Sequence, residues 1–283
     1  MTLGVFLAVL GAALLHATWN ALVKISADRL VLLAVLKTVT TGLAVASVPF
    51  LPPLPVEVWP YLAASVVIHT AYFLFLTISY RLGDLSHVYP LSRGVAPLIV
   101  AVLAFVLLGE RLGEQALIAL VLISAGIISL SFGGMPGKEG RGHPKAVLAA
   151  LATGAMIAGY TVADGAAVRH APDALSYLLW LNVFNGVPII LIAVLRRRRV
   201  LLPQARRVWK AGALSALVSL WAYWIVLWAS TQAPLSLVAA VREVSMVFAV
   251  LIGVIFLKER LEVRKVMSVF VTLAGTMLLR VSR

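Results

Sequence analysis

The chain has 283 residues, of which 62% are hydrophobic and only 12% are charged. Soluble globular proteins carry about 25% charged residues, so this composition excludes a soluble domain and indicates an integral membrane protein. The net charge of +13 does not indicate nucleic-acid binding, because the basic residues lie in short gaps between apolar runs, where they act as topology signals. The chain contains no cysteine, which excludes a thiolate nucleophile, a thiolate metal site and a disulfide.

The apolar runs predict ten transmembrane helices, since one crossing of a bilayer takes about 20 apolar residues. The first run has no basic flank and no cleavage site, so we expect a retained helix and not a signal peptide. In chain order the predicted spans are 3–24, 30–50, 60–80, 89–109, 114–132, 146–168, 174–195, 210–231, 235–257 and 264–281. The Gly- and Pro-rich stretch 133–145 is the most linker-like segment. It separates a five-helix unit over 1–132 from a second one over 146–283.

The two units resemble each other at a fixed offset of 149 residues. At this offset Arg93, Val95, Leu108, Glu110–Leu112 and Ala125–Gly126 fall on Arg242, Val244, Leu257, Glu259–Leu261 and Ala274–Gly275. An offset of 151 also places Ala71–Tyr72 on Ala222–Tyr223. Because each unit has an odd number of helices, the second must enter the membrane from the opposite side, which predicts an inverted-topology repeat. Such repeats are typical of secondary transporters; a repeat kept only for packing is the alternative.

Four motifs resemble the EamA family of the drug/metabolite transporter superfamily. They are the first-helix string His16–Lys24, the run from Pro97 to Leu112, Ser124–Gly126, and Lys258–Leu261. The resemblance covers nearly the whole chain. It implies ten helices in a five-plus-five inverted repeat, with a central cavity lined mainly by helices 1, 3, 4, 6, 8 and 9. Met246 stands where the first unit has Pro97, so the two corresponding helices are expected to bend differently.

The basic residues give one orientation and the resemblance leans toward the other. Arg111, Arg169, Arg280 and Arg283 lie on the side of the termini, while Lys37, Arg93 and Arg242 fall inside predicted spans. The remaining 17 of the 24 Lys and Arg residues lie on the opposite side. The positive-inside rule then places both termini outside the cytoplasm, in a bacterial inner membrane. The family resemblance favours cytoplasmic termini; we favour the charge count.

Ionisable residues inside the spans are the first candidates for function, because burying a charge in a bilayer is costly. Arg93 and Arg242 are expected near opposite mouths of the cavity, as gating or substrate-pairing groups or as snorkelling anchors. Glu243 and Asp164 are the acids well inside the spans. Either could exchange a coupling proton or pair statically with an arginine. Glu110 and Glu259 are interpreted as parts of structural turns.

A second group of polar and aromatic residues is predicted to line the substrate pocket near mid-depth. Its members are His16, Trp19, Asn20, His69, Tyr72, Tyr160 and Trp224. Rings of this kind can hold an apolar body, while an amide and imidazoles can bind a polar head. The alternative for each is ordinary helix packing. The spacing of the histidines does not match a metal site, and no catalytic residue or cofactor is expected.

The repeat predicts a secondary transporter that works by alternating access, and the resemblance to the EamA family implies that it exports small metabolites such as amino acids. Its expected partners are a small-molecule substrate and the lipid bilayer, with a proton as the candidate coupling ion, and no nucleic acid. A multidrug exporter of hydrophobic cations is the alternative, but it should carry a carboxylate at mid-depth, and the first helix has His16 and no acid. An intramembrane enzyme is disfavoured, because no nucleophile and base stand at a recognisable spacing.

Overall fold

The computed structural model describes residues 1–132, 144–256, 258 and 262–281, and these contain helices and no strand. The first half comprises α1 (Leu3–Ile25), α2 (Arg29–Ser47), η1 (Val48–Phe50), α3 (Val58–Leu82), α4 (Leu85–Leu108), α5 (Glu114–Ser129) and η2 (Leu130–Phe132). The second comprises α6 (Pro144–His170), α7 (Ala174–Asn185), α8 (Val187–Gln232), α9 (Leu235–Arg242), α10 (Ser245–Ile255) and α11 (Val263–Val281). Most of the expected linker 133–145 and the Glu259–Leu261 motif lie outside the described residues.

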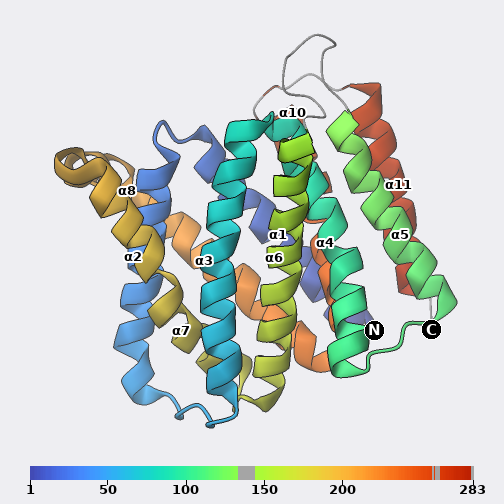
Figure 1. Ribbon diagram of the computed structural model, residues 1–283, viewed down its shortest axis with the longest axis horizontal. Helices are drawn as coiled ribbons and strands as arrows, with labels where there is room; N and C mark the ends of the chain where they lie inside the picture. The colour runs from blue at the N-terminus through green and yellow to red at the C-terminus, as the bar shows by residue number, and fades with distance from the viewer. Residues whose placement is uncertain (133–143, 257, 259–261, 282–283) are drawn as a thin grey trace.

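Within the described residues, eight helical stretches are long and apolar enough to cross a membrane. The longest, Ala174–Gln232, has 59 residues, which is sufficient for two crossings. It turns back at Arg198, whose φ of 39° and ψ of −115° interrupt α8 (Figure 1). The amphipathic α11 is not one of the eight. Ten crossings, which would require both arms of α7–α8 and also α11, remain a prediction.

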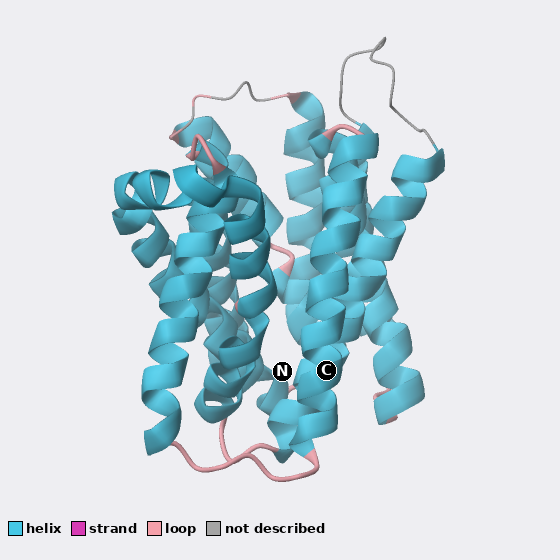
Figure 2. Cartoon of the chain, turned by 60° about the vertical axis from the view of Figure 1, so that its left-hand side comes forward, coloured by secondary structure: helices cyan, strands magenta, loops and turns pink. Residues whose placement is uncertain are grey.

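Two predicted spans are interrupted where the sequence indicates continuous helices. Gly186 separates α7 from α8, and the predicted span 235–257 is divided into α9 and α10 at Glu243 and Val244. There the hydrogen bonds shorten from the i−4 to the i−3 pattern, as in a 3₁₀ turn, with Val244 N donating to Val241 O at 3.1 Å. In Figure 2 a short stretch of loop is visible about halfway up the helical bundle. By contrast, α4 stays continuous although it contains Pro90 and Pro97.

The helices run between two ends of the molecule (Figures 1 and 2). We call the end where α1 begins and α11 finishes the terminal end, and the end where α1 finishes and α6 begins the linker end. Helices of the two halves are interleaved: α1 and α2 pack along α8, α3 and α4 along α6, and α5 along α11. A space between them is therefore bounded by both halves.

The α5–α11 contact is reciprocal. A Cβ on Gly126 would lie 2.9 Å from Thr272 N and 3.2 Å from Ser268 O. A Cβ on Gly275 would lie 2.9 Å from Ile123 N and 3.0 Å from Ala119 O. Thr272 and Ser268 are the 149-residue counterparts of Ile123 and Ala119, so each helix presents the same surface to the other. Glycines permit this close backbone approach, as expected for small residues between membrane helices.

The repeat also extends to the backbone. Gly109 ends α4 in the left-handed region with φ of 67°, and Lys258, its counterpart at the 149-residue offset, has φ of 55°. Glycine adopts this conformation without steric cost, whereas a residue with a Cβ is strained. Lys258 therefore has the left-handed conformation of its counterpart although it carries a Cβ.

Candidate substrate cavity

A cavity of about 850 Å³ lies between the two halves of the bundle. Its wall comes from α1, α2, α3 and α4 of the first half and from every α-helix of the second half, with Arg242 as the contribution of α9. It reaches the surface at the linker end, where its wall includes the exposed residues Lys24, Arg29 and Arg196. It extends inward to about mid-depth, at Ala12 of α1 and Met246 of α10.

Six of the seven residues predicted for the pocket lie on the wall of this cavity: His16, Trp19, Asn20, His69, Tyr72 and Tyr160. The expectation for Trp224 is wrong, because its ring meets Trp221 edge-on at 5.3 Å and lies outside the cavity wall. Tyr223 occupies the wall in its place. Adjacent helical residues point about 100° apart, and an apolar run does not reveal the inward face. The repeat match of Tyr72 with Tyr223 was the signal that identified the correct residue.

Aromatic rings form one side of the cavity. The ring of His69 stacks on Tyr160 with centroids 3.9 Å apart and an interplanar angle of 20°. Tyr72 meets the same Tyr160 ring edge-on at 5.9 Å. The Nδ1 atom of His69 lies 3.0 Å from Ser65 O, which fixes the orientation of the imidazole. These contacts form a preorganised, largely apolar surface with a few polar atoms.

Glu243 joins the two predicted arginines at the inner end of the cavity. Arg93 Nε lies 2.8 Å from Glu243 Oε2, and Arg242 Nη2 lies 3.8 Å from Glu243 Oε1. The side chains are buried, with exposed fractions of 5% for Arg93, 6% for Arg242 and 1% for Glu243. A charge buried this deeply needs a partner of opposite sign, because without one its desolvation cost would not be offset.

The expectation that Arg93 and Arg242 lie at opposite mouths is therefore wrong. Helix α4 begins at Leu85, one turn before the predicted start, so Arg93 lies about 12 Å from the linker end at 1.5 Å per residue. Arg242 lies about 10 Å from the start of α9 at the terminal end. Their backbones consequently differ in depth by only about 10 Å, which two long side chains and an intervening glutamate can span.

Asp164 does not pair with an arginine. Its Oδ1 accepts a hydrogen bond of 2.6 Å from the Tyr177 hydroxyl, and its Oδ2 accepts one from Tyr223. Tyr223 lines the cavity, whereas Asp164 is 1% exposed and lies behind it. The acid thus holds a wall residue in position from behind.

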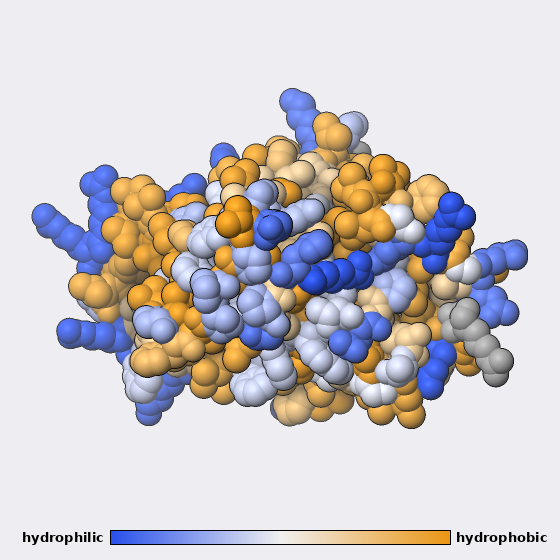
Figure 3. All heavy atoms as spheres, turned by 90° about the horizontal axis from the view of Figure 1, so that it is seen from below, coloured by the Kyte–Doolittle hydropathy of each residue, from blue (hydrophilic) through white to orange (hydrophobic). Residues whose placement is uncertain are grey.

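At the terminal end, Glu110 links three segments. It accepts a hydrogen bond of 2.7 Å from Arg169 at the end of α6 and one of 2.8 Å from the backbone N–H of Leu235 at the start of α9. Arg169 also donates to Ser230 O at 3.0 Å at the end of α8. Figure 3, which looks onto this end, shows polar residues gathered across its middle between apolar side chains. We call Glu110, Arg169 and the Leu235 N–H the Glu110 junction.

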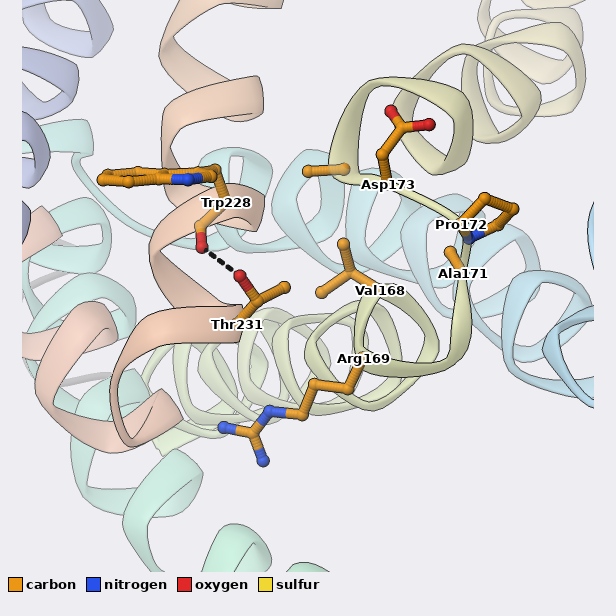
Figure 4. Close-up of a pocket in the computed structure, with 8 residues that line it drawn as sticks. Val168, Arg169, Ala171, Pro172, Asp173, Trp228 and Thr231 are labelled. Carbon is orange, nitrogen blue, oxygen red and sulfur yellow. Dashed lines mark hydrogen bonds between the residues drawn. The ribbon is translucent and has the colours of Figure 1, made fainter. Parts of the chain in front are cut away.

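The sequence predicts only a structural turn at Glu110, so this junction was not expected. The signal was present in the repeat: a glutamate kept in both halves beside the same turn. Arg169 also lines a depression of about 400 Å³ on the surface of this end, together with Asp173 and Trp228 (Figure 4). Asp173 is fixed there by capping α7, so Arg169 is the charged wall residue that also belongs to the junction.

A different ion pair holds the linker end. Arg197 Nε lies 2.6 Å from Asp28 Oδ2, which ties the start of α2 to the kink of α8. Burial alone would raise the pKa of Asp28, but hydrogen bonds from Arg197 and from the Val31 and Leu30 amides outweigh it. The pKa of Asp28 is consequently lowered. Among the described residues, no group of three or more His, Asp or Glu side chains comes together as a metal site.

The chain matches the EamA-like transporter family over residues 2–132 and again over 144–281. It is 30% identical to the multidrug resistance protein EbrB of Bacillus atrophaeus over 83 residues, which make up 29% of this chain and 70% of that protein. It is 32% identical to EbrB of Bacillus subtilis (strain 168) over 75 residues, or 26% of this chain and 63% of that protein.

A solved crystal structure shares the fold, with a TM-score of 0.76 and 16% identity over 98% of both chains. The two family matches together span nearly all of the described residues, and the helical bundle encloses a cavity between the matched halves. The chain belongs to the EamA-like transporter family within the drug/metabolite transporter superfamily.

Proposed function

We propose that this transporter is a secondary exporter of small amphipathic metabolites and that it works by alternating access. The observation that carries the proposal is the asymmetry of the cavity, which reaches the surface at the linker end and ends at mid-depth. Beyond it, the Glu110 junction ties α6, α8 and α9 together. This arrangement is expected of a transporter in a conformation with one gate open and the other closed.

Two features favour an inverted repeat behind this mechanism. One is the reciprocal α5–α11 contact, in which corresponding glycines meet corresponding backbone atoms, as two-fold related elements do. The other is the left-handed backbone conformation that Gly109 and Lys258 share. If the halves exchange conformations, the segment after α10 would close the linker end when the terminal end opens, as the segment after α4 closes the terminal end in this state.

We further propose that the linker end faces the cytoplasm, because most Lys and Arg residues lie there. The state with an open linker end then receives substrates from inside the cell. The aromatic wall would hold the apolar body of a substrate, and its few polar atoms would orient the head.

Export of hydrophobic cations is the second candidate, since the similar EbrB proteins are named for multidrug resistance. Such a substrate would need a carboxylate facing the cavity. The described wall residues include none, and both Glu243 and Asp164 are engaged behind the wall.

Single-cysteine labelling tests alternating access directly, because the chain contains no native cysteine. We expect Ala21→Cys, on the cavity wall near the linker end, and Leu237→Cys, buried in α9, to respond in opposite directions when a substrate drives turnover. Labelling of Ala21→Cys should slow while labelling of Leu237→Cys accelerates. Parallel changes at both sites, or none during measured flux in proteoliposomes, would contradict alternating access.

A further inference from the structure

The cavity wall has charges of one sign. Five basic residues form a rim at the linker end: Lys24, Arg29, Arg81, Arg196 and Lys265. Three more lie deeper on the wall: Lys37, Arg93 and Arg242. Among the described residues, the wall contains no aspartate or glutamate. The rim alone does not indicate a ligand of a particular charge, because the positive-inside rule concentrates basic residues at the cytoplasmic end of membrane proteins.

The three deeper cations require a different explanation. Lys37 lies eight residues into α2, about 12 Å from the linker end, at a depth similar to that of Arg93. Topology signals act in loops and at helix ends, and a charge at this depth is costly. Glu243 compensates only one of the three positive charges, and Lys37 has no ion pair among the described residues. The inner cavity therefore retains a net positive charge.

Part of the guanidinium hydrogen-bonding capacity also remains unused. Nη2 of Arg93 and Nε of Arg242 are buried and have no hydrogen-bond partner in the described part of the chain. Both residues line the cavity, and both guanidinium groups lie beside the same Glu243 carboxylate. A buried donor without a partner is costly, so these nitrogens favour a ligand that accepts hydrogen bonds.

We propose that the cavity selects organic anions, with the acidic head among Lys37, Arg93 and Arg242 and an apolar or aromatic body against the His69–Tyr160–Tyr72 wall. This rests on the proposed function of the cavity as the transport site. A guanidinium and a carboxylate form charge-assisted hydrogen bonds, and the low dielectric of the bundle strengthens them. A zwitterionic amino acid brings an ammonium group for which the wall offers no carboxylate. The preferred substrate class is therefore a monoanionic acid without an amine.

Three probes with the same phenyl ring separate charge from shape: 3-phenylpropanoate, L-phenylalanine and 2-phenylethylamine, with net charges of −1, 0 and +1 at pH 7. Calorimetric titration of the purified full-length protein should give a Kd for the anion about tenfold or more below that of phenylalanine, because the ammonium group of phenylalanine finds no partner on the wall and a cost of about 1.4 kcal/mol corresponds to tenfold. The amine should not bind saturably. Equal or tighter binding of the amine or the zwitterion, or no binding of the anion, would overturn the proposal.

A matched pair of lysine variants tests the site itself. Lys37→Met removes a charge from the wall, whereas Lys210→Met removes one from the exposed surface beside Trp209. We expect Lys37→Met to weaken binding of 3-phenylpropanoate about tenfold and Lys210→Met to leave it unchanged. Equal effects would show that the binding responds only to the overall charge of the protein.

Glu243→Gln gives an effect of opposite sign, because it frees a positive charge and should tighten anion binding. The gain in affinity for the anion is expected even if the variant is less stable, and a loss of affinity in a folded variant would contradict the proposal.

Counterflow of labelled 3-phenylpropanoate into proteoliposomes, with protein-free vesicles as the blank, separates the proposed transport function from the inference of anion selectivity. Selective binding without flux removes the proposed transport function alone. Flux of phenylalanine or phenylethylamine without anion preference removes the anion inference alone.

Discussion

The two ends of the molecule are held by different chemistry. At the linker end, exposed basic side chains surround the opening, and the Asp28–Arg197 pair lies beside it at the kink of α8. At the terminal end, a single carboxylate, Glu110, receives donors from α6 and α9. The two regions meet at Glu243, which is buried between Arg93 and Arg242. Under the proposed alternating-access mechanism, opening the terminal end would break the few contacts of the Glu110 junction, whereas the buried charges at the centre would stay paired.

The centre should give the largest effect on stability. Arg93→Gln leaves Glu243 with Arg242 alone, at 3.8 Å, and should lower the free energy of unfolding by about 3–5 kcal/mol. Denaturant titration in detergent measures this loss. Arg242→Gln should cost less, because the 2.8 Å pair with Arg93 survives. The double variant Arg93→Gln/Glu243→Gln should recover most of the stability; no recovery would mean that packing and not charge dominates.

The terminal end should respond mainly in transport. Glu110→Gln weakens the bonds from Arg169 and Leu235 and shifts the population toward an open terminal end. We expect proteoliposome flux to fall more than tenfold and the free energy of unfolding by only about 1.5–3 kcal/mol. Glu114→Gln, at an exposed glutamate four residues later at the start of α5, is the matched control and should transport normally. A Glu110→Gln protein with unchanged flux would show that the junction is only structural.

The α5–α11 contact offers a test of the proposed two-fold symmetry between the halves. Gly126→Ala and Gly275→Ala each push a methyl group against the opposite backbone and should each cost about 1–3 kcal/mol. Equal losses in thermal unfolding support two equivalent positions. Gly11→Ala is the control, because a Cβ there meets nothing within 4 Å. Losses that differ by more than about 1 kcal/mol would argue against the equivalence.

Lys258, the left-handed counterpart of Gly109, offers a substitution that should raise stability. Lys258→Gly should raise the free energy of unfolding by about 1 kcal/mol, because the residue already has a φ of 55°. Lys258→Ala should bring no such gain, since alanine keeps the Cβ. If both variants behave alike, the charge of Lys258 and not its backbone conformation determines the result.

The smallest effect concerns the ion pair at the linker end. Asp28→Asn keeps a capping side chain for α2 but loses the charge, and it should cost about 0.5 kcal/mol at neutral pH. The pKa of Asp28 is lowered, so its contribution is complete above the unfolded value of about 3.9 and disappears as the pH falls through the lowered value. Unfolding of wild type and variant at pH 7 and pH 3 measures the difference. A gap that widens toward pH 3 would contradict this assignment.

The sequence predicted most helices well, because length and hydropathy determine whether a segment spans a bilayer. It did not predict the break at Glu243, since apolar residues flank the charged pair Arg242–Glu243 on both sides and neither proline nor glycine marks the break. It also did not reveal which side of a helix faces inward, so Trp224 was chosen where Tyr223 lines the cavity. Glu110 was missed because its partners lie 59 and 125 residues away in the chain.

The reciprocal glycine contact also has an evolutionary meaning. Two copies of a single half-length chain that dimerise about a two-fold axis make this kind of interface, in which each partner presents one surface to itself. The B. atrophaeus relative, of which 83 residues make up 70%, is shorter than half of this chain. Gene duplication followed by fusion would convert such a homodimer into one polypeptide while leaving its seam in place. Once fused, the copies could diverge separately, which would allow Gly109 in one half to correspond to Lys258 in the other.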